Sequence, residues 1–302
     1  MSEGKDLKSI IKSLEYSDTA KIVSQVVEQQ GRVRANMDKV RHKIAVMSGK
    51  GGVGKSMVTV NLAVAFARRG YRVGILDSDF NGPCIPKMMG LSDLSFQITP
   101  EGAIPPLGPF HIKVASLGSF VSREENCTRW KGPIGSTPVW LGTLEMSVLR
   151  EFLSDVIWGE IDYFFIDLPP GAAADKPPAI ARFIPDLDGA VVVTIPTEIS
   201  LSVVRKSIAY ARGLGISILG LIENMSGFVC PGCGVEASQF EGETQRVVSN
   251  LDITLLGKIP FDRNLSRCCD RGEPLEEGHF IARRFSEISG VITKLLSSRE
   301  SE

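Results

Sequence analysis

The sequence lacks the features that mark membrane, secreted and nucleic-acid-binding proteins. None of its apolar runs approaches the roughly 20 residues that span a bilayer. Its first residues, Met1-Ser2-Glu3-Gly4-Lys5-Asp6, have no apolar stretch of the kind found in a secretory signal peptide. No block of basic residues stands out and the formal net charge is −1, so non-specific binding to nucleic acid has little electrostatic support. We therefore expect a cytoplasmic protein with no membrane and no nucleic-acid partner.

Cysteine is also scarce, with six in 302 residues. In a cytoplasmic protein these are more often free thiols or metal ligands than disulfides. Only Cys230 and Cys233 have the C-x-x-C spacing that brings two sulfurs to one metal, and the second pair that a zinc ribbon needs is absent. A symmetric dimer would bring four thiolates together, which suits a 4Fe-4S cluster on the two-fold axis or Zn²⁺. Spacing selects none of the other cysteines as ligands: Cys84, Cys127, Cys268 and Cys269.

The pattern of apolar residues predicts an α/β fold. Residues 1–40 are polar, with hydrophobic residues at helical spacing, and we expect a helical appendage to a domain that covers 41–302. From Lys43 onward, continuous apolar runs alternate with segments of helix length, which is typical of strands buried on both faces of a mostly parallel sheet flanked by helices. A proline-rich stretch, Leu91 to Pro109, indicates a long surface excursion, and the last helix is expected over about Phe280 to Leu296. The expected strands are Ile44–Met47, Val73–Leu76, Ile112–Leu117, Tyr163–Ile166, Ala190–Ile195, Ile216–Ile222 and Ile253–Ile259.

One stretch between an expected strand and an expected helix fits the phosphate-loop pattern G-x-x-x-x-G-K-[ST]. In such loops the backbone N–H groups surround phosphates, the lysine reaches the outer phosphates and the final hydroxyl binds Mg²⁺. A bound phosphate would then lie at a helix N-terminus, where free N–H groups favour anions. The stretch therefore predicts a nucleotide site made by Gly49, Lys50, Gly51, Gly52, Val53, Gly54, Lys55 and Ser56.

Three aspartates follow two of the expected strands. Asp77 and Asp79 come at the end of the strand Val73–Leu76, and in open α/β sheets ligands bind at this end of the strands. One carboxylate can hold water on Mg²⁺ while the other orients the attacking water, although helix capping is the plainer alternative for Asp79. Asp167 ends another apolar strand, as in the Walker B pattern, and is expected to reach the Mg²⁺ shell.

The loop and three further motifs together resemble the Mrp/ApbC family of P-loop ATPases, which are iron–sulfur cluster carriers. The motifs, in chain order, are L-D-S-D-F-N-G-P-C-I-P from residue 76, I-D-L-P-P-G from residue 166 and E-N-M-S-G-F-V-C-P-G-C-G from residue 223. The second lysine of the loop, Lys50, makes K-G-G-V-G-K-S similar to the deviant Walker A loop of the nitrogenase-iron-protein and ParA/MinD group. The resemblance runs from about Lys43 to Pro274.

This resemblance implies an ATP-dependent homodimer that binds a 4Fe-4S cluster at its interface and passes it to apo-proteins, with slow ATP hydrolysis. Its partners would be apo iron–sulfur clients and cluster-assembly factors. By position, it implies that Lys50 reaches the partner's nucleotide, that Lys50, Lys55 and Asp79 are catalytic, that Ser56, Asp77 and Asp167 serve Mg²⁺, that Asn224 contacts adenine, and that Cys230 and Cys233 bind the cluster.

The chain departs from the family pattern at three places. Met57, which we include among the nucleotide-binding residues, stands where family members usually carry a threonine or serine whose hydroxyl can touch the α-phosphate. The switch II run after Gly171 reads A-A-A-D instead of T-G-D, and Asn81 and Cys84 replace the usual tyrosine and serine of switch I. These changes leave nucleotide binding expected and the hydrolysis rate open. The alternatives are a nucleotide-binding regulatory or adaptor dimer with little turnover and a MinD/ParA-like positioning ATPase.

Overall fold

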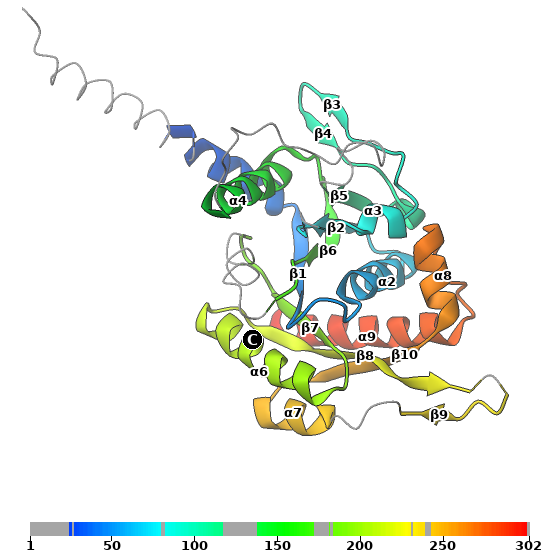
Figure 1. Cartoon of the computed structure of the whole chain (residues 1–302). Coiled ribbons are helices and arrows are strands. Elements are labelled where there is room, and N and C mark those ends of the chain that lie inside the picture. Colours follow the sequence, from blue (N-terminus) through cyan, green and yellow to red (C-terminus); the bar gives the residue numbers. More distant parts are fainter. Residues whose placement is uncertain are drawn as a thin grey trace, which may run out of the picture.

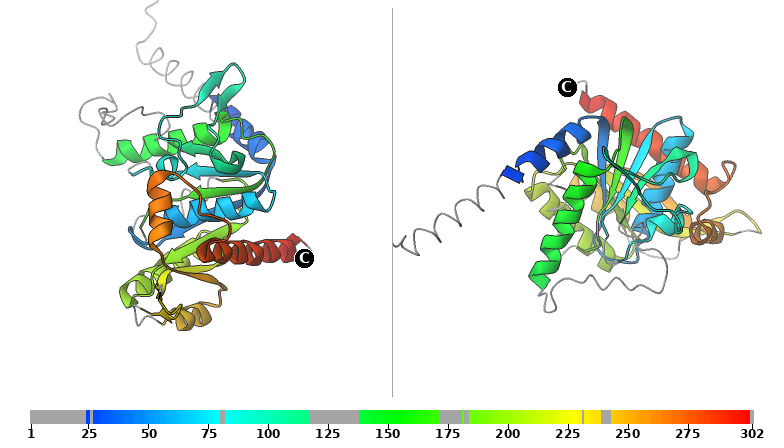
Figure 2. Two further views of the ribbon diagram at one scale, coloured as in Figure 1. Left: turned by 90° about the vertical axis from the view of Figure 1, so that its right-hand side faces the viewer. Right: turned by 90° about the horizontal axis from the view of Figure 1, so that it is seen from above.

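The computed structural model describes residues 24–25, 27–79, 82–116, 138–171, 181, 184–230, 232–238 and 243–300. A parallel sheet with strand order β10-β8-β7-β1-β6-β2-β5 forms its centre, and the short β9 pairs antiparallel with β8. Figures 1 and 2 show this sheet between two layers of helices. The predicted α/β class with a mostly parallel sheet is confirmed. The strands of the main sheet are β1 (Val40–Ser48), β2 (Val73–Asp77), β5 (Lys113–Ser116), β6 (Ile161–Asp167), β7 (Gly189–Thr194), β8 (Ile218–Val229), β9 (Glu236–Ala237) and β10 (Leu255–Phe261).

The helices bury an apolar core on each face of the sheet. Ile44 and Val46 of β1 face one core, together with side chains of α2, α8 and α9. Ala45 and Met47 face the other core, with side chains of α4, α6 and α7. Because Ile44–Met47 of β1 is buried on both faces, this stretch is continuously apolar; full burial of each large side chain contributes about 1.5–3 kcal/mol. The helices are α2 (Lys55–Arg68), α3 (Ile85–Met88), the one-turn η1 (Pro109–His111), α4 (Pro138–Asp155), α6 (Glu198–Gly213), α7 (Thr244–Leu251), α8 (Arg263–Arg271) and α9 (Phe280–Glu300).

Two predicted segments differ from the structure. The proline-rich excursion contains a small antiparallel hairpin, β3 (Gln97–Thr99) and β4 (Gly102–Ile104), which stands apart from the main sheet. β8 does not end near Ile222 but continues to Val229, because Glu223, Asn224 and Phe228 pair with β10 and the last two residues pair with β9. Both differences concern short pairings that lie outside any long apolar run, for which hydrophobic periodicity carries little signal.

The described part of the N-terminal segment is helical over residues 27–37. Val33 and Met37 are buried in the core that α4 also faces. The side-chain amide of Asn36 donates to the carbonyls of Leu153 and Val156, at 2.9 and 2.7 Å, and so ties this helix to the end of α4. The boundary expected near residue 40 stays a prediction, and residues 1–23 lie outside the described part.

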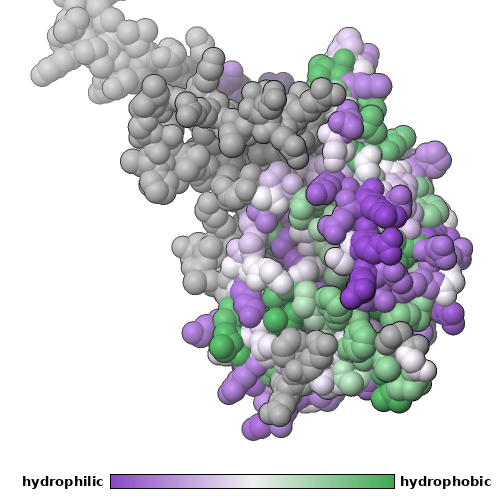
Figure 3. Space-filling view, turned by 45° about the vertical axis from the view of Figure 1, so that its right-hand side comes forward, coloured by the Kyte–Doolittle hydropathy of each residue, from purple (hydrophilic) through white to green (hydrophobic). Residues whose placement is uncertain are grey.

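The described helices include none that is both long and apolar enough to cross a membrane. The outer side of α8 is very polar, with Arg263, Arg267 and Arg271 exposed. Figure 3 shows a hydrophilic patch on the face that carries this helix, with more hydrophobic side chains below it.

Candidate functional site: a phosphate loop and a cysteine turn

The glycine-rich loop joins the carboxyl end of β1 to the first turn of α2. Gly52 and Gly54 both have positive φ angles, +78° and +81°, which glycine adopts at little cost. A Cβ at Gly54 would lie 2.3 Å from Nδ2 of Asn224, so the loop and β8 approach each other as closely as glycine allows. All of the predicted loop residues except Gly49 line a pocket of about 200 Å³. Its lining consists of Ser48, Lys50, Gly51, Gly52, Val53, Gly54, Lys55, Ser56, Met57, Asp79, Cys84, Met88 and Pro170.

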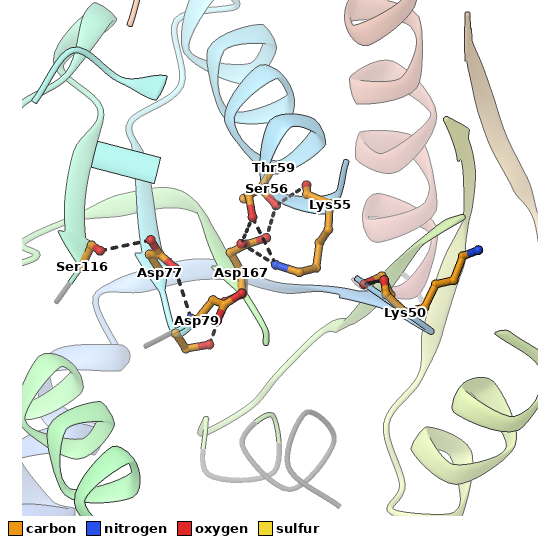
Figure 4. A network of polar contacts seen from close by, with 10 residues as sticks. Lys50, Lys55, Ser56, Thr59, Asp77, Asp79, Ser116 and Asp167 are labelled. Atoms are coloured by element: carbon orange, nitrogen blue, oxygen red, sulfur yellow. Dashed lines mark hydrogen bonds and ion pairs between the residues drawn. The ribbon is translucent and has the colours of Figure 1, made fainter. Parts of the chain in front are cut away.

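Asp167, at the end of β6, is the centre of the polar network beneath the loop (Figure 4). Its Oδ2 accepts hydrogen bonds from Lys55 Nζ at 2.5 Å and from Ser56 Oγ at 2.6 Å. Its Oδ1 accepts one from Thr59 Oγ1 at 2.6 Å. The carboxylate is fully buried, so the ion pair with Lys55 and the two hydroxyl donors together offset the cost of burying its charge.

The same donors fit a nucleotide with Mg²⁺. Lys55 and Ser56 are the two groups that the loop pattern assigns to phosphate and metal, and here they bind an anionic oxygen of Asp167 instead. Carboxylate and hydroxyl oxygens are also the ligands that Mg²⁺ prefers. The residues present therefore suit the group that the loop pattern implies.

Asp77 lies beside Asp167, as its register partner on the neighbouring strand β2. Its Oδ1 accepts the backbone N–H of Asp79 at 3.1 Å, and its Oδ2 accepts the hydroxyl of Ser116 at 3.0 Å. Burial raises the pKa of Asp77 to about 7; the charge of Asp167 adds to the rise and Lys55 opposes it. Asp77 thus fixes the start of the segment that brings Asp79 to the pocket.

Lys50 and Asn224 are predicted site residues that lie outside the network around Asp167. The side chain of Lys50 points away from Lys55 and Asp167 (Figure 4). Asn224 is buried beneath the loop and its Nδ2 donates to the carbonyl of Val53 at 2.8 Å. The structure therefore gives Asn224 a supporting contact to the loop, and its contact with adenine stays a prediction.

The predicted cysteine pair lies at the turn between β8 and β9. The backbone N–H of Cys230 donates to Val235 O at 3.0 Å, and that of Gly234 donates to Cys230 O at 2.8 Å, which closes the turn. The pKa of Cys230 is lowered by the backbone N–H of Cys233, then by that of Gly232. Cys233 is exposed. A thiol whose pKa is lowered by N–H donors, on an accessible turn, has the properties of a metal-binding thiolate.

The remaining described cysteines have the opposite character. Cys84 is half-buried in the nucleotide pocket, and burial raises its pKa. Burial also raises the pKa of Cys268, and raises that of Cys269 to about 11. In the part of the chain that the structure describes, no group of three or more His, Cys, Asp or Glu side chains lies together as a metal site. Cys127, Asn81 and the altered switch II run after Gly171 lie outside that part.

Comparison with protein-family models matches residues 39–296 to the family described as ParA, NUBPL iron-transfer P-loop NTPase. The chain belongs to this family. Two curated proteins similar to this NUBPL-type chain are each named iron-sulfur cluster carrier protein. That of Methanocaldococcus jannaschii is 43% identical over 259 residues, covering 85% of this chain and 84% of its own. That of Saccharolobus solfataricus is 40% identical over 288 residues, covering 94% of this chain and 93% of its own.

A solved structure supports the fold of this family member. The nucleotide-binding protein of Archaeoglobus fulgidus, in complex with ADP, has a TM-score of 0.69 and 37% identity over 80% of this chain and 91% of its own. The expected relation to P-loop iron–sulfur carriers is confirmed.

Two residues of the NUBPL-type site were not predicted from the sequence. Thr59 lies one helical turn after Ser56, on the same face of α2, so the spacing of the helix could have indicated it. Ser116 ends β5, and only the strand order places it beside Asp77.

Proposed function

We propose that this protein is an ATP-binding iron–sulfur cluster carrier that acts as a homodimer in the cytoplasm. Its cargo would be a 4Fe-4S cluster held between the cysteine turns of two copies and passed to apo-proteins. The observation that carries this proposal is the turn itself, in which Cys230 and Cys233 are accessible and N–H donors lower the pKa of Cys230. The names of the two archaeal relatives agree with it.

A second copy would complete the cargo site. Each chain offers one C-x-x-C pair, while a thiolate-bound cubane takes four ligands. Exposed apolar side chains flank the turn: Phe228 and Phe261 are register partners on β8 and β10, and Val235 follows the turn. Two turns close enough to share one cluster would cover these side chains, which favours association of two copies over exposure of each patch to water.

The nucleotide site would supply control of the cycle through slow hydrolysis of ATP. Lys55 would bind the outer phosphates, while Ser56, Asp77 and Asp167 would hold Mg²⁺, which supplies charge neutralisation when bound. Asp79, which lines the pocket, would orient the attacking water. The side chain of Lys50 points away from Lys55 and Asp167, which is the direction that a contact with the partner's nucleotide would require.

Anaerobic reconstitution with iron and sulfide tests the cargo. We expect about two iron atoms per chain, with the absorbance of a 4Fe-4S cluster and transfer of that cluster to an apo-protein acceptor. Cys230→Ala and Cys233→Ala should each lose the cluster, whereas the matched Cys268→Ser/Cys269→Ser double variant should keep it. Four irons on a monomer, loss only in the double variant, or tight Zn²⁺ with no cluster would each contradict the proposal.

A steady-state assay tests hydrolysis separately, with Lys55→Ala as the control for background phosphate release. Turnover no greater than that of the control would remove the ATPase part and leave a nucleotide-binding carrier.

A further inference from the structure

We infer that Thr59 is a positioning residue of the nucleotide site, which holds the carboxylate of Asp167 in place when Lys55 and Ser56 leave it for the nucleotide. The inference rests on the proposed nucleotide function. The phosphate-loop pattern ends at Ser56, so nothing in it includes Thr59. The residue is fully buried on α2, and its hydroxyl lies 2.6 Å from Asp167 Oδ1.

The short contact distinguishes Thr59 from an ordinary helical threonine. Buried threonines in helices commonly donate to the carbonyl four residues earlier, and Thr59 Oγ1 does lie 3.1 Å from Lys55 O. A hydroxyl has a single proton to donate. The contact with Asp167 is 0.5 Å shorter (3.1 minus 2.6) and involves a charged acceptor, which is the stronger kind of hydrogen bond. The proton therefore goes to Asp167.

The arrangement of donors on Asp167 shows what Thr59 does. Lys55 and Ser56 both donate to Oδ2, and both are the groups that phosphate and Mg²⁺ would take. Thr59 donates to Oδ1 and has no such second role. Once Lys55 and Ser56 turn to the nucleotide, Thr59 is the one of the three donors that stays, so that Oδ2 remains directed at the metal.

The other residues around Asp167 do not replace the hydrogen bond from Thr59. Ser78 holds the main chain of Asp167, donating to its carbonyl through both N–H and hydroxyl at 3.0 and 2.7 Å, but leaves the carboxylate free to rotate. Asp77 lies beside it on β2. A buried carboxylate without its hydroxyl donor would lose the orientation that metal binding needs, because removing a hydrogen bond to a buried charge costs more than removing a neutral one.

The test compares nucleotide affinity with and without the metal, using a fluorescent ATP analogue in excess Mg²⁺ and in EDTA. Thr59→Val keeps the shape and removes the hydroxyl; we expect it to weaken binding about tenfold in Mg²⁺ and less than about twofold in EDTA. Thr59→Ser, which keeps the hydroxyl, should restore the Mg²⁺ affinity. Thr293→Val is the control for loss of a helical threonine hydroxyl away from the site, since Thr293 makes the same i−4 bond in α9 at 2.9 Å and also accepts from Arg69 at 3.3 Å.

Each outcome is decisive. An equal loss in Mg²⁺ and EDTA, or no loss in either, overturns the positioning role. In an Asp167→Asn background the effect of Thr59→Val should disappear, and an undiminished effect there also overturns it. If Thr59→Val does not fold, Thr59→Ala takes its place, with Thr59→Ser as reference. Wild-type protein that binds no nucleotide in either condition would refute the proposed nucleotide function instead.

Discussion

The buried carboxylate of Asp77 should make the free energy of unfolding fall as the pH rises from 5 to 8. Burial raises its pKa from an ordinary 3.8 to about 7 in the folded protein without ligands. In the unfolded chain the group returns to its ordinary value. Between these two values the folded protein holds a proton that the unfolded chain has released. The stabilising contribution is therefore full at low pH and is lost as the pH rises through about 7.

The size of the effect follows from the two pKa values. One pKa unit corresponds to about 1.4 kcal/mol, and a single group that shifts from 3.8 to about 7 loses about 3 kcal/mol between pH 5 and pH 8. This is a substantial part of the roughly 5–15 kcal/mol by which domains are stable. Exposed carboxylates elsewhere contribute to the pH dependence of every variant alike, so the comparison between variants isolates Asp77.

Urea unfolding of the wild type and of Asp77→Asn, in EDTA and without nucleotide, measures this contribution. Asparagine keeps the size of the side chain and cannot ionise in this range. The wild-type free energy of unfolding should fall by about 3 kcal/mol relative to Asp77→Asn from pH 5 to pH 8. Asp93→Asn, at an exposed aspartate, controls for the change in net charge. Parallel curves for the wild type and Asp77→Asn would refute the reasoning.

Three further predictions concern the N-terminal helix, the loop and the dimer. Asn36→Ala removes two hydrogen bonds to the end of α4 and should lower the free energy of unfolding by about 1–3 kcal/mol, measured in urea, with exposed Ser92→Ala unchanged. Gly54→Ala forces a Cβ against Asn224 at a φ of +81° and should abolish binding of a fluorescent nucleotide, whereas Gly70→Ala should not. Lys50→Ala and Asp79→Asn should each slow ATP hydrolysis and keep nucleotide binding; Lys50→Ala with wild-type turnover would contradict the cross-dimer role.

The fold could be predicted where one physical cause acts along contiguous residues. A strand segment covered on both faces is continuously apolar, so at least part of each of the seven parallel strands could be found as an apolar run in the sequence. The hairpin of β3 and β4 and the second half of β8 could not, because they form no long apolar run and gain their pairing from segments distant in sequence or folded back by a turn. Register and strand order are properties of the assembled sheet, and no local pattern encodes them.

The site residues also fall into two groups, those that local motifs predict and those that only the folded structure brings to the site. The loop, Asp77, Asp79, Asp167 and the cysteine pair are short motifs whose chemistry is local, and the structure brings the loop and the aspartates together beside one pocket. Ser116 has a partner 39 positions away, and Thr59 has one 108 positions away. Both are ordinary hydroxyl residues in sequence, and only the packing of β5 beside β2 and of α2 above β6 gives them a charged partner.

The structure gives Asn224 a role that its motif does not predict. Resemblance assigns it to adenine, yet here its amide supports the loop through Val53 and leaves no room for a Cβ at Gly54. The close approach explains why position 54 requires glycine beyond its φ angle. Asn224 also lies on β8, the strand that ends immediately before Cys230. The phosphate loop therefore rests on the same strand that presents the cysteine turn, so the two halves of the proposed function are joined through β8 rather than carried by two separate parts of the chain.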